Sequence, residues 1–228
     1  MTARVDAFIA FLLEQEVLQF GDFTLKSGRR SPYFFNLGKI SHGSAYATLG
    51  EAYADAIIAA EIEFDVLFGP AYKGIPIAVA TAAALARRGC DVGVAYNRKE
   101  AKDHGEGGTL VGAPVDGRVL LIDDVLTSGR AIREVLELLA ATPARVVGAM
   151  VAMDRQEVMD PEASSAQASG ESQTAIGQLA GEIAAPVIGI AAMTDLIRYL
   201  DGSAESQDYA GILDRMRAYQ AEYCVKLT

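Results

Sequence analysis

The sequence predicts an α/β fold in which about five mainly parallel strands form a sheet flanked by helices. Short continuous apolar runs recur between residues 65 and 191, and segments with helical periodicity lie between several of them. Such runs are typical of strands that are buried on both faces of a parallel sheet. The chain has 228 residues, of which 51% are apolar. We therefore expect one domain, 1–228, with one sizeable core.

The N-terminal segment predicts a helix, two short strands and a second helix. The first helix carries apolar residues at the spacing of one buried face, namely Val5, Phe8, Ile9, Leu12 and Leu13. Residues 23–40, FTLKSGRRSPYFFNLGKI, indicate two strands around a Ser-Gly-rich turn. The second helix is expected over residues 44–60, with Tyr46, Leu49, Tyr53 and Ile57 on one side.

From residue 65 onward, strands and helices alternate. The strands are expected at 65–70, 91–96, 118–123, 145–154 and 185–191. Helices are expected after the first and third strands, before the fifth strand, and at the C-terminal end, where Tyr209, Ile212, Leu213, Met216 and Tyr219 have helical spacing. Ligands of such sheets bind beyond the carboxyl ends of the strands. Candidate functional residues should therefore directly follow the strands.

Two segments lack this pattern. Residues 98–117 are glycine-rich and charged, which predicts a long exposed loop, and loops of that length in compact domains are usually functional or disordered. Residues 160–172, DPEASSAQASGES, indicate a polar, solvated insertion without chemistry.

Charge and composition exclude several classes of function. The net charge of −10 argues against nucleic-acid binding, and no apolar run approaches the ~18 residues of a membrane span. Cys90 and Cys224 lie far apart without metal-site spacing, which suits a reducing cytoplasm. The first residues lack a signal-peptide pattern, so we expect a cytoplasmic protein.

The strongest motif lies at the end of the third strand, in VLLIDDVLTSGRA. Asp123 and Asp124 end an apolar run, and the turn Thr127-Ser128-Gly129 then leads into a helix. No lysine follows the glycine as in a P-loop, and no dinucleotide-binding glycine pattern is present. The turn and the helix N-terminus suit a phosphate. The acids suit vicinal hydroxyls and a divalent cation, so together they predict a sugar phosphate. The alternative is that the acids only cap the helix.

Two further constellations are cationic. In FGPAYKGIP, Gly69 and Gly74 permit close approach of the backbone, and Lys73 adds a charge suited to a pyrophosphate. A plain strand–helix turn with a surface lysine is the alternative interpretation. Residues 98–113 bring together Arg98, Lys99, Lys102 and His104. Such a charged, glycine-hinged loop can neutralise a leaving pyrophosphate and exclude water, although taken alone it could also be a solvated loop.

These segments resemble a known family. VLLIDDVLTSGRA is similar to the phosphoribosyl-pyrophosphate (PRPP) motif of type I phosphoribosyltransferases. LKSGRRSPYFFNLG, NRKEAKDHGEGG and AMDRQE resemble the N-terminal segment, catalytic loop and fourth strand end of orotate phosphoribosyltransferases. The resemblance runs from about residue 20 to about residue 200, and the insertion at 160–172 departs from it. It implies the type I phosphoribosyltransferase fold, with a small N-terminal hood over residues 1–40 that binds the acceptor. It also implies a pentosyltransferase that makes orotidine 5-phosphate from PRPP and orotate for UMP biosynthesis.

The resemblance also implies roles for individual residues. It places Lys99, Lys102, His104 and Asp124 in catalysis. It assigns PRPP binding to Lys26, Tyr72, Lys73, Arg98, Lys99, Lys102, His104, Asp123, Asp124, Val125, Leu126, Thr127, Ser128, Gly129, Arg130 and Ala131. It implies Mg²⁺ held mainly through PRPP without a direct protein ligand, a mobile loop at 98–113, and a homodimer with active sites shared between subunits.

Orotate binding is expected from Lys26, Phe34, Phe35, Thr127 and Arg155. Lys26 and Arg155 can meet the anionic parts of orotate, the arginine through its planar fork. The two phenylalanines can offer an aromatic face and backbone amides, although by themselves they would more simply be core residues. Two alternatives remain open: a phosphoribosyltransferase with a purine or uracil acceptor, and a PRPP-sensing regulator without enzymatic activity.

Overall fold

The structure is a computed structural model, and it describes residues 2–25, 27–102, 108–126, 130–158, 174–203 and 209–225. For residues 101, 102, 108, 130 and 131 only the backbone is described. Several residues with expected roles therefore lie outside the described residues, namely Lys26, His104, Thr127, Ser128, Gly129 and the insertion at 160–172. The same limit applies to the side chains of Lys102, Arg130 and Ala131.

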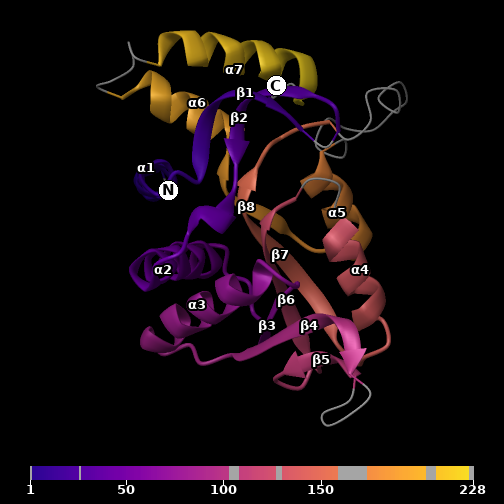
Figure 1. The fold of residues 1–228 in the computed structure, drawn as a ribbon. Helices are drawn as coiled ribbons and strands as arrows, with labels where there is room; N and C mark the ends of the chain where they lie inside the picture. The colour runs from indigo at the N-terminus through magenta and orange to yellow at the C-terminus, as the bar shows by residue number, and fades with distance from the viewer. Residues whose placement is uncertain are drawn as a thin grey trace.

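The main sheet has six strands in the order β5-β4-β3-β6-β7-β8 (Figure 1). The strands are β3 (Val66–Gly69), β4 (Gly93–Lys102), β5 (Gly108–Gly112), β6 (Arg118–Val125), β7 (Arg145–Asp154) and β8 (Val187–Ala192). All neighbouring pairs are parallel except β4 and β5, which are antiparallel. The predicted α/β fold with a mainly parallel sheet is confirmed, and all five predicted strands are present.

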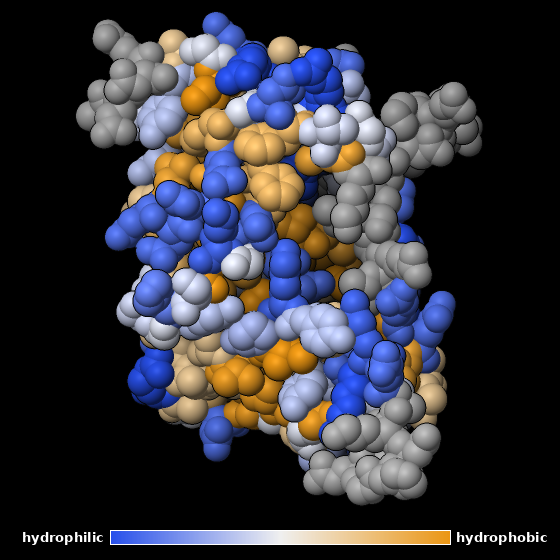
Figure 2. Space-filling model, in the orientation of Figure 1, coloured by the Kyte–Doolittle hydropathy of each residue, from blue (hydrophilic) through white to orange (hydrophobic). Residues whose placement is uncertain are grey.

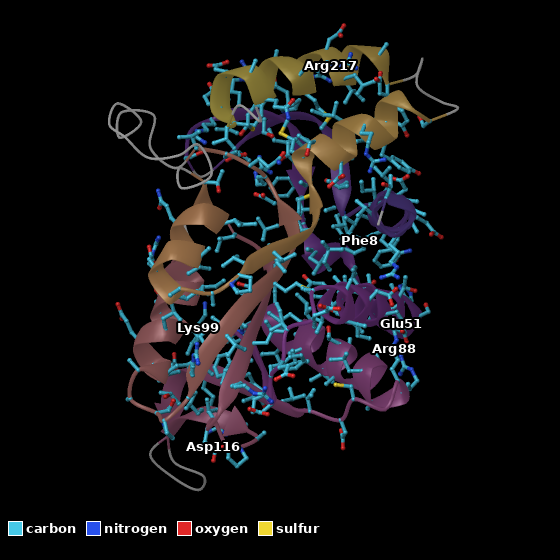
Figure 3. All side chains as sticks on the ribbon, turned by 180° about the vertical axis from the view of Figure 1, so that it is seen from behind. Phe8, Glu51, Arg88, Lys99, Asp116 and Arg217 are labelled. Atoms are coloured by element: carbon cyan, nitrogen blue, oxygen red, sulfur yellow. The ribbon has the colours of Figure 1, made fainter. Side chains whose placement is uncertain are left out.

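Helices cover both faces of this sheet, with α2 and α3 on one face and α4 and α5 on the other (Figure 1). Their bounds are α2 (Gly43–Ala59), α3 (Gly74–Arg87), α4 (Arg130–Leu139) and α5 (Ala175–Ile183). Arg88, directly after α3, pairs with Glu51 of α2, and the two side chains lie next to one another (Figure 3). The helix expected at 44–60 is confirmed within one residue at each end, and α4 confirms the helix expected after the third strand.

The two faces of the sheet contribute to two apolar clusters because side chains alternate along each strand. On β6, Leu120 and Ile122 pack toward the α2–α3 side, whereas Val119 and Leu121 pack with Ile132 of α4. All four β6 residues are fully buried. The strand is therefore fully buried in the core from Val119 to Ile122, directly before Asp123.

The N-terminal hood is a two-stranded antiparallel sheet, β1 (Leu18–Thr24) and β2 (Arg30–Phe35). It lies with α6 (Met193–Asp201) and α7 (Ala210–Tyr223) at one end of the molecule (Figure 1). The first helix, α1 (Thr2–Glu14), and the C-terminal helix were both predicted; α6 was not. The first hood strand begins at Leu18, earlier than the predicted residue 23. A short 3₁₀ helix, Leu37–Lys39, follows β2.

The expectation of an irregular loop over residues 98–117 was wrong for most of its described part. β4 continues to Lys102, and β5 returns beside it, with Tyr96 opposite Val111 and Asn97 opposite Leu110. Gly112 permits this pairing because its φ is +103° and a Cβ there would lie 2.2 Å from the Val94 carbonyl oxygen. The charged end of β4 extends beyond its pairing with β3 and has only β5 beside it, so no apolar alternation marks it in the sequence.

Candidate active site

The carboxyl ends of β3, β6 and β7 carry the candidate residues to one edge of the sheet. These strands are adjacent and parallel, so the turn after Gly69, the pair Asp123–Asp124 and Arg155 all follow the same edge. This edge faces the hood, and the molecular surface is hollowed between the two (Figure 2). The sequence-based prediction of a strand-end site is consistent with this arrangement.

The two carboxylates at the end of β6 have different surroundings. Asp123 is 9% exposed, and burial together with the neighbouring charge of Asp124 raises its pKa from 3.8 to about 7. Asp124 instead forms an ion pair with Lys73, with 2.6 Å between Oδ2 and Nζ. The Asp124 backbone N–H donates to Oδ1 of Asp123 at 2.9 Å. Asp123 binds a proton readily, and Asp124 is paired with a lysine. Two such carboxyl groups suit hydroxyl groups better than a phosphate.

A buried tyrosine fixes the backbone beneath this pair. The Tyr53 hydroxyl donates to the carbonyl oxygen of Asp123 at 2.7 Å, and Tyr53 is fully buried in α2. Burial raises the pKa of this hydroxyl, so it remains protonated and a donor at neutral pH. Sequence reasoning assigned Tyr53 only to the apolar side of a helix. The hydrogen bond of its hydroxyl joins residues 70 positions apart, so no local sequence pattern indicates it.

The turn between β3 and α3 supplies the second part of the site. Its Ala71–Tyr72 peptide bond is cis, and the Ala71 N–H donates to Oδ1 of Asn97 at 2.9 Å. The turn is tight, because a Cβ on Gly69 would lie 2.2 Å from the Gly74 carbonyl oxygen. A Cβ on Gly74 would lie 2.7 Å from Cδ of Pro70, so neither position has room for a side chain.

Cationic residues surround this turn. The Nζ atom of Lys99 lies 4.9 Å from the centre of the Tyr72 ring, and Tyr72 is 68% exposed. Figure 3 shows Lys99 on β4, and Arg98 precedes it on the same strand. The structure thus brings together four expected PRPP-binding residues, Tyr72, Lys73, Lys99 and Asp124. Leu126 is buried in the α4-side cluster and Val125 packs against the other. Their side chains belong to the core, which leaves their backbone for a ligand.

The aromatic pair of β2 is divided between surface and core. Phe34 is 37% exposed and stacks on Phe23, with ring centres 5.4 Å apart. Phe35 is buried in the core beneath the hood. The expected aromatic face is therefore limited to Phe34, because strand alternation turns the Phe35 ring inward.

Arg155 is buried against the hood at the end of β7. Its Nε donates to Oε1 of Glu157 at 2.6 Å, its Nη2 donates to the Ser31 hydroxyl at 3.3 Å, and its guanidinium lies 4.4 Å from the Tyr33 ring centre. Glu157 also accepts a hydrogen bond from the Tyr219 hydroxyl at 2.7 Å. Sequence reasoning missed these partners, although Glu157 lies within the quoted AMDRQE motif.

Two carboxylates of this site have the chemistry that Mg²⁺ prefers. Within the described ranges, no group of three His, Cys, Asp or Glu side chains comes together as a metal site. Asp123 and Asp124 do provide carboxylate oxygens at one point, and Mg²⁺ commonly binds one or two carboxylates together with substrate phosphates and water.

Comparisons with known proteins agree with this geometry. Residues 38–177 match the family model described as the phosphoribosyl transferase domain. An orotate phosphoribosyltransferase of Pseudomonas paraeruginosa is 51% identical over 98% of this chain and 99% of its own length. Another, from Vibrio vulnificus, is 50% identical over 98% and 99%. A solved orotate phosphoribosyltransferase of Francisella tularensis is 36% identical, with a TM-score of 0.79 over 96% of this chain and 99% of that one. The chain therefore belongs to the orotate phosphoribosyltransferase family.

Proposed function

We propose that this protein transfers the 5-phosphoribosyl group from PRPP to N1 of orotate, giving orotidine 5-phosphate and pyrophosphate for UMP synthesis. The observation that carries the proposal is the pair Asp123–Asp124 beside Lys73, at the same sheet edge as Arg155. The pair suits the ribose hydroxyls of a donor, and the buried guanidinium suits the carboxylate of an acceptor. Family membership supports both assignments.

The reaction needs no protein nucleophile. As the bond between C1 and the pyrophosphate oxygen breaks, positive charge grows on the ribose and negative charge on the leaving group. Lys73, which pairs with Asp124, and Lys99, which lies over the Tyr72 ring, neutralise the leaving pyrophosphate. Asp124 lies beside the developing positive charge of the ribose. Charged groups fixed in advance at such positions commonly contribute 10²–10³-fold in kcat, or about 3–4 kcal/mol.

The remaining donor-binding roles fall on the turn and the hairpin. We assign the 5-phosphate to the backbone of Thr127-Ser128-Gly129 and the helix start at Arg130 and Ala131, because helix N-termini attract anions. Lys102 and His104, with Lys99 and Asp124, complete the catalytic set. The proposal includes movement of residues 98–113 over the donor, which would exclude water.

The acceptor is assigned to the hood side. Arg155 meets the carboxylate of orotate, and Lys26 and Thr127 contribute further polar contacts. Phe34 offers the aromatic face, and Phe35 contributes only its backbone, because its ring is in the core.

Magnesium is part of the proposal as a partner of PRPP. When bound, Mg²⁺ would neutralise pyrophosphate charge and draw the donor toward the carboxylates. The chain itself holds the ribose through Asp123 and Asp124 and needs no direct metal ligand.

We also propose a homodimer with shared active sites. An apolar depression between α2 and α3, lined by Tyr46, Ile75, Val79 and Ala83 among others, supports a contact face there, and Val79 is 51% exposed. Mixing Lys102→Ala with Asp124→Asn tests site sharing. If each site takes one residue from each subunit, the mixture recovers up to roughly a quarter of wild-type activity, because half of the dimers hold one intact site. No recovery would mean that each subunit carries a self-contained site.

A cytoplasmic location completes the proposal. Cys90 is exposed and Cys224 is buried, and both are free thiols, which suits a reducing compartment. No helix in the described part of the chain is long and apolar enough to cross a membrane.

A panel of bases tests the acceptor assignment. The purified protein is incubated with PRPP and Mg²⁺ and with orotate, uracil, adenine or hypoxanthine in turn, and pyrophosphate release is measured. We expect pyrophosphate release with orotate and with none of the other three bases. Turnover of a purine or of uracil without orotate would instead identify another phosphoribosyltransferase. PRPP binding without turnover of any base would indicate a sensor.

A further inference from the structure

Glu157 lies at a junction of three segments that are distant in the sequence, namely its own segment after β7, α7 and the turn between the hood strands. Its Oε1 accepts hydrogen bonds from Arg155 Nε at 2.6 Å and from the Tyr219 hydroxyl at 2.7 Å. Its Oε2 is 3.4 Å from Nη1 of Arg29, which belongs to the turn between the hood strands. The side chains of Arg155, Arg29 and Glu157 are only 7%, 14% and 18% exposed. These contacts therefore act with little screening by solvent.

Glu157 pairs with two positive charges at this junction. Arg155 and Arg29 bring two positive charges, and among the described residues Glu157 is the carboxylate that forms an ion pair with each of them. Burial of an unpaired charge is costly. Loss of the Glu157 carboxylate would therefore leave both guanidinium groups without the partner that holds them in place.

The contacts also orient the guanidinium. Glu157 holds the Nε side of Arg155, Ser31 accepts from Nη2 at 3.3 Å, and the Tyr33 ring lies 4.4 Å from the guanidinium carbon. These contacts fix the plane of the guanidinium before a ligand binds, so its N–H groups that make none of these contacts can meet an anion without further ordering.

The C-terminal helix is tied to this junction through its backbone as well. The Val158 N–H donates to the Tyr223 carbonyl oxygen at 2.8 Å, and the Val225 N–H donates to the Gln156 carbonyl oxygen at 3.1 Å. The last residue of α7 and a residue just after the helix therefore pair with the segment that carries Glu157. The Tyr219 ring packs edge-on against the Tyr33 ring, with centres 6.3 Å apart. Helix α7, on which Arg217 is labelled, lies over this end of the molecule (Figure 3).

We infer that Glu157, fixed by Tyr219 of α7, is a positioning residue for Arg155, through which the C-terminal helix sets the affinity for the acceptor's carboxylate. This inference rests on the proposed function, because it takes Arg155 as the contact to orotate. Glu157 and Tyr219 act through Arg155 and touch neither the donor nor the reacting atoms. Their loss should therefore weaken acceptor binding and spare donor binding.

Two variants test this inference, Tyr219→Phe and Glu157→Gln. Tyr219→Phe keeps the ring and removes only the hydroxyl, so folding should survive. Both variants should raise the KM for orotate. For Glu157→Gln we expect an increase of about tenfold or more, which corresponds to the smallest usual cost of losing a hydrogen bond to a charged group. The KM for PRPP should change by less than about twofold. Tyr223→Phe is the matched control, because that hydroxyl lies on the same helix and does not bond Glu157 in this structure.

The outcomes separate the inference from the function on which it rests. A raised KM for orotate in both variants, with the control and the KM for PRPP unchanged, supports the inference. If wild-type protein turns orotate over but Tyr219→Phe and Glu157→Gln keep its KM, the inference is wrong and the proposed function stands. If KM for PRPP rises equally, the junction is structural and the inference fails again. If wild-type protein does not turn orotate over, the proposed function fails, and the inference fails with it.

Discussion

Replacing Asp123 with asparagine should stabilise the folded protein at neutral pH and reduce its activity. The carboxyl is 9% exposed and lies beside Asp124, so burial and like charge both oppose its ionisation and raise its pKa to about 7. Asparagine has nearly the same shape and can still accept the Asp124 N–H through Oδ1, which the carboxylate accepts at 2.9 Å. The substitution therefore removes a charge while keeping the contact.

The size of the effect follows from the pKa. The value rises from 3.8 to about 7 on folding, and each tenfold change in proton affinity is worth about 1.4 kcal/mol. The folded state binds the proton more tightly, so the free energy of unfolding falls as pH rises between about 4 and 7. Above pH 7 the ionised side chain lowers the free energy of unfolding by about 4 kcal/mol, and near pH 4 by less than about 1 kcal/mol.

Urea unfolding of wild-type protein and Asp123→Asn at pH 4 and pH 8 measures this difference. At pH 8 the variant should be more stable by several kcal/mol, with about 4 kcal/mol as the upper limit, and at pH 4 the two should nearly coincide. Its turnover should fall, because the ribose loses a carboxylate partner. Equal stability at pH 8, or a less stable variant, would refute the argument that Asp123 is held at a cost for its function.

Two other substitutions test the support around the site. Gly69→Ala places a Cβ 2.2 Å from the Gly74 carbonyl oxygen, so it should lower the free energy of unfolding by at least about 2 kcal/mol and raise the KM for PRPP. Gly181→Ala, a helical position with nothing within 4 Å, is its control and should stabilise by about 0.5–1 kcal/mol in urea unfolding. Tyr53→Phe removes the hydrogen bond to the Asp123 carbonyl oxygen and should cost about 1 kcal/mol by the same measurement. An unchanged unfolding midpoint would show that this hydroxyl does not support the strand end.

The strand-end residues could be predicted from the sequence because they depend on local pattern. A continuous apolar run that ends in Asp123 and Asp124 marks both a buried strand and the point where it leaves the core. The same logic located Lys73 and Arg155 after their strands. The sheet order that brings these residues to one edge is also typical of alternating strands and helices.

The interactions that hold these residues in place could not be predicted, because they join distant segments. Tyr53 is 70 residues from Asp123, and Tyr219 is 62 residues from Glu157. Both tyrosines occupy apolar helical positions, where the pattern reports only burial. The β4–β5 hairpin was missed for a different reason. The charged end of β4 extends beyond β3, so its side chains show no apolar alternation, although backbone pairing with β5 still forms the strand.

The central claim is that the donor and acceptor assigned to this site react with each other. Loss of orotate absorbance after addition of PRPP, with and without Mg²⁺, tests it most directly. We expect the absorbance to decrease only when both PRPP and Mg²⁺ are present, with one pyrophosphate released for each orotate consumed. The rate of this decrease should be at least about 10²-fold lower in Asp124→Asn. Unchanged orotate absorbance with both PRPP and Mg²⁺ present, in a protein that is folded and binds PRPP, would contradict the account.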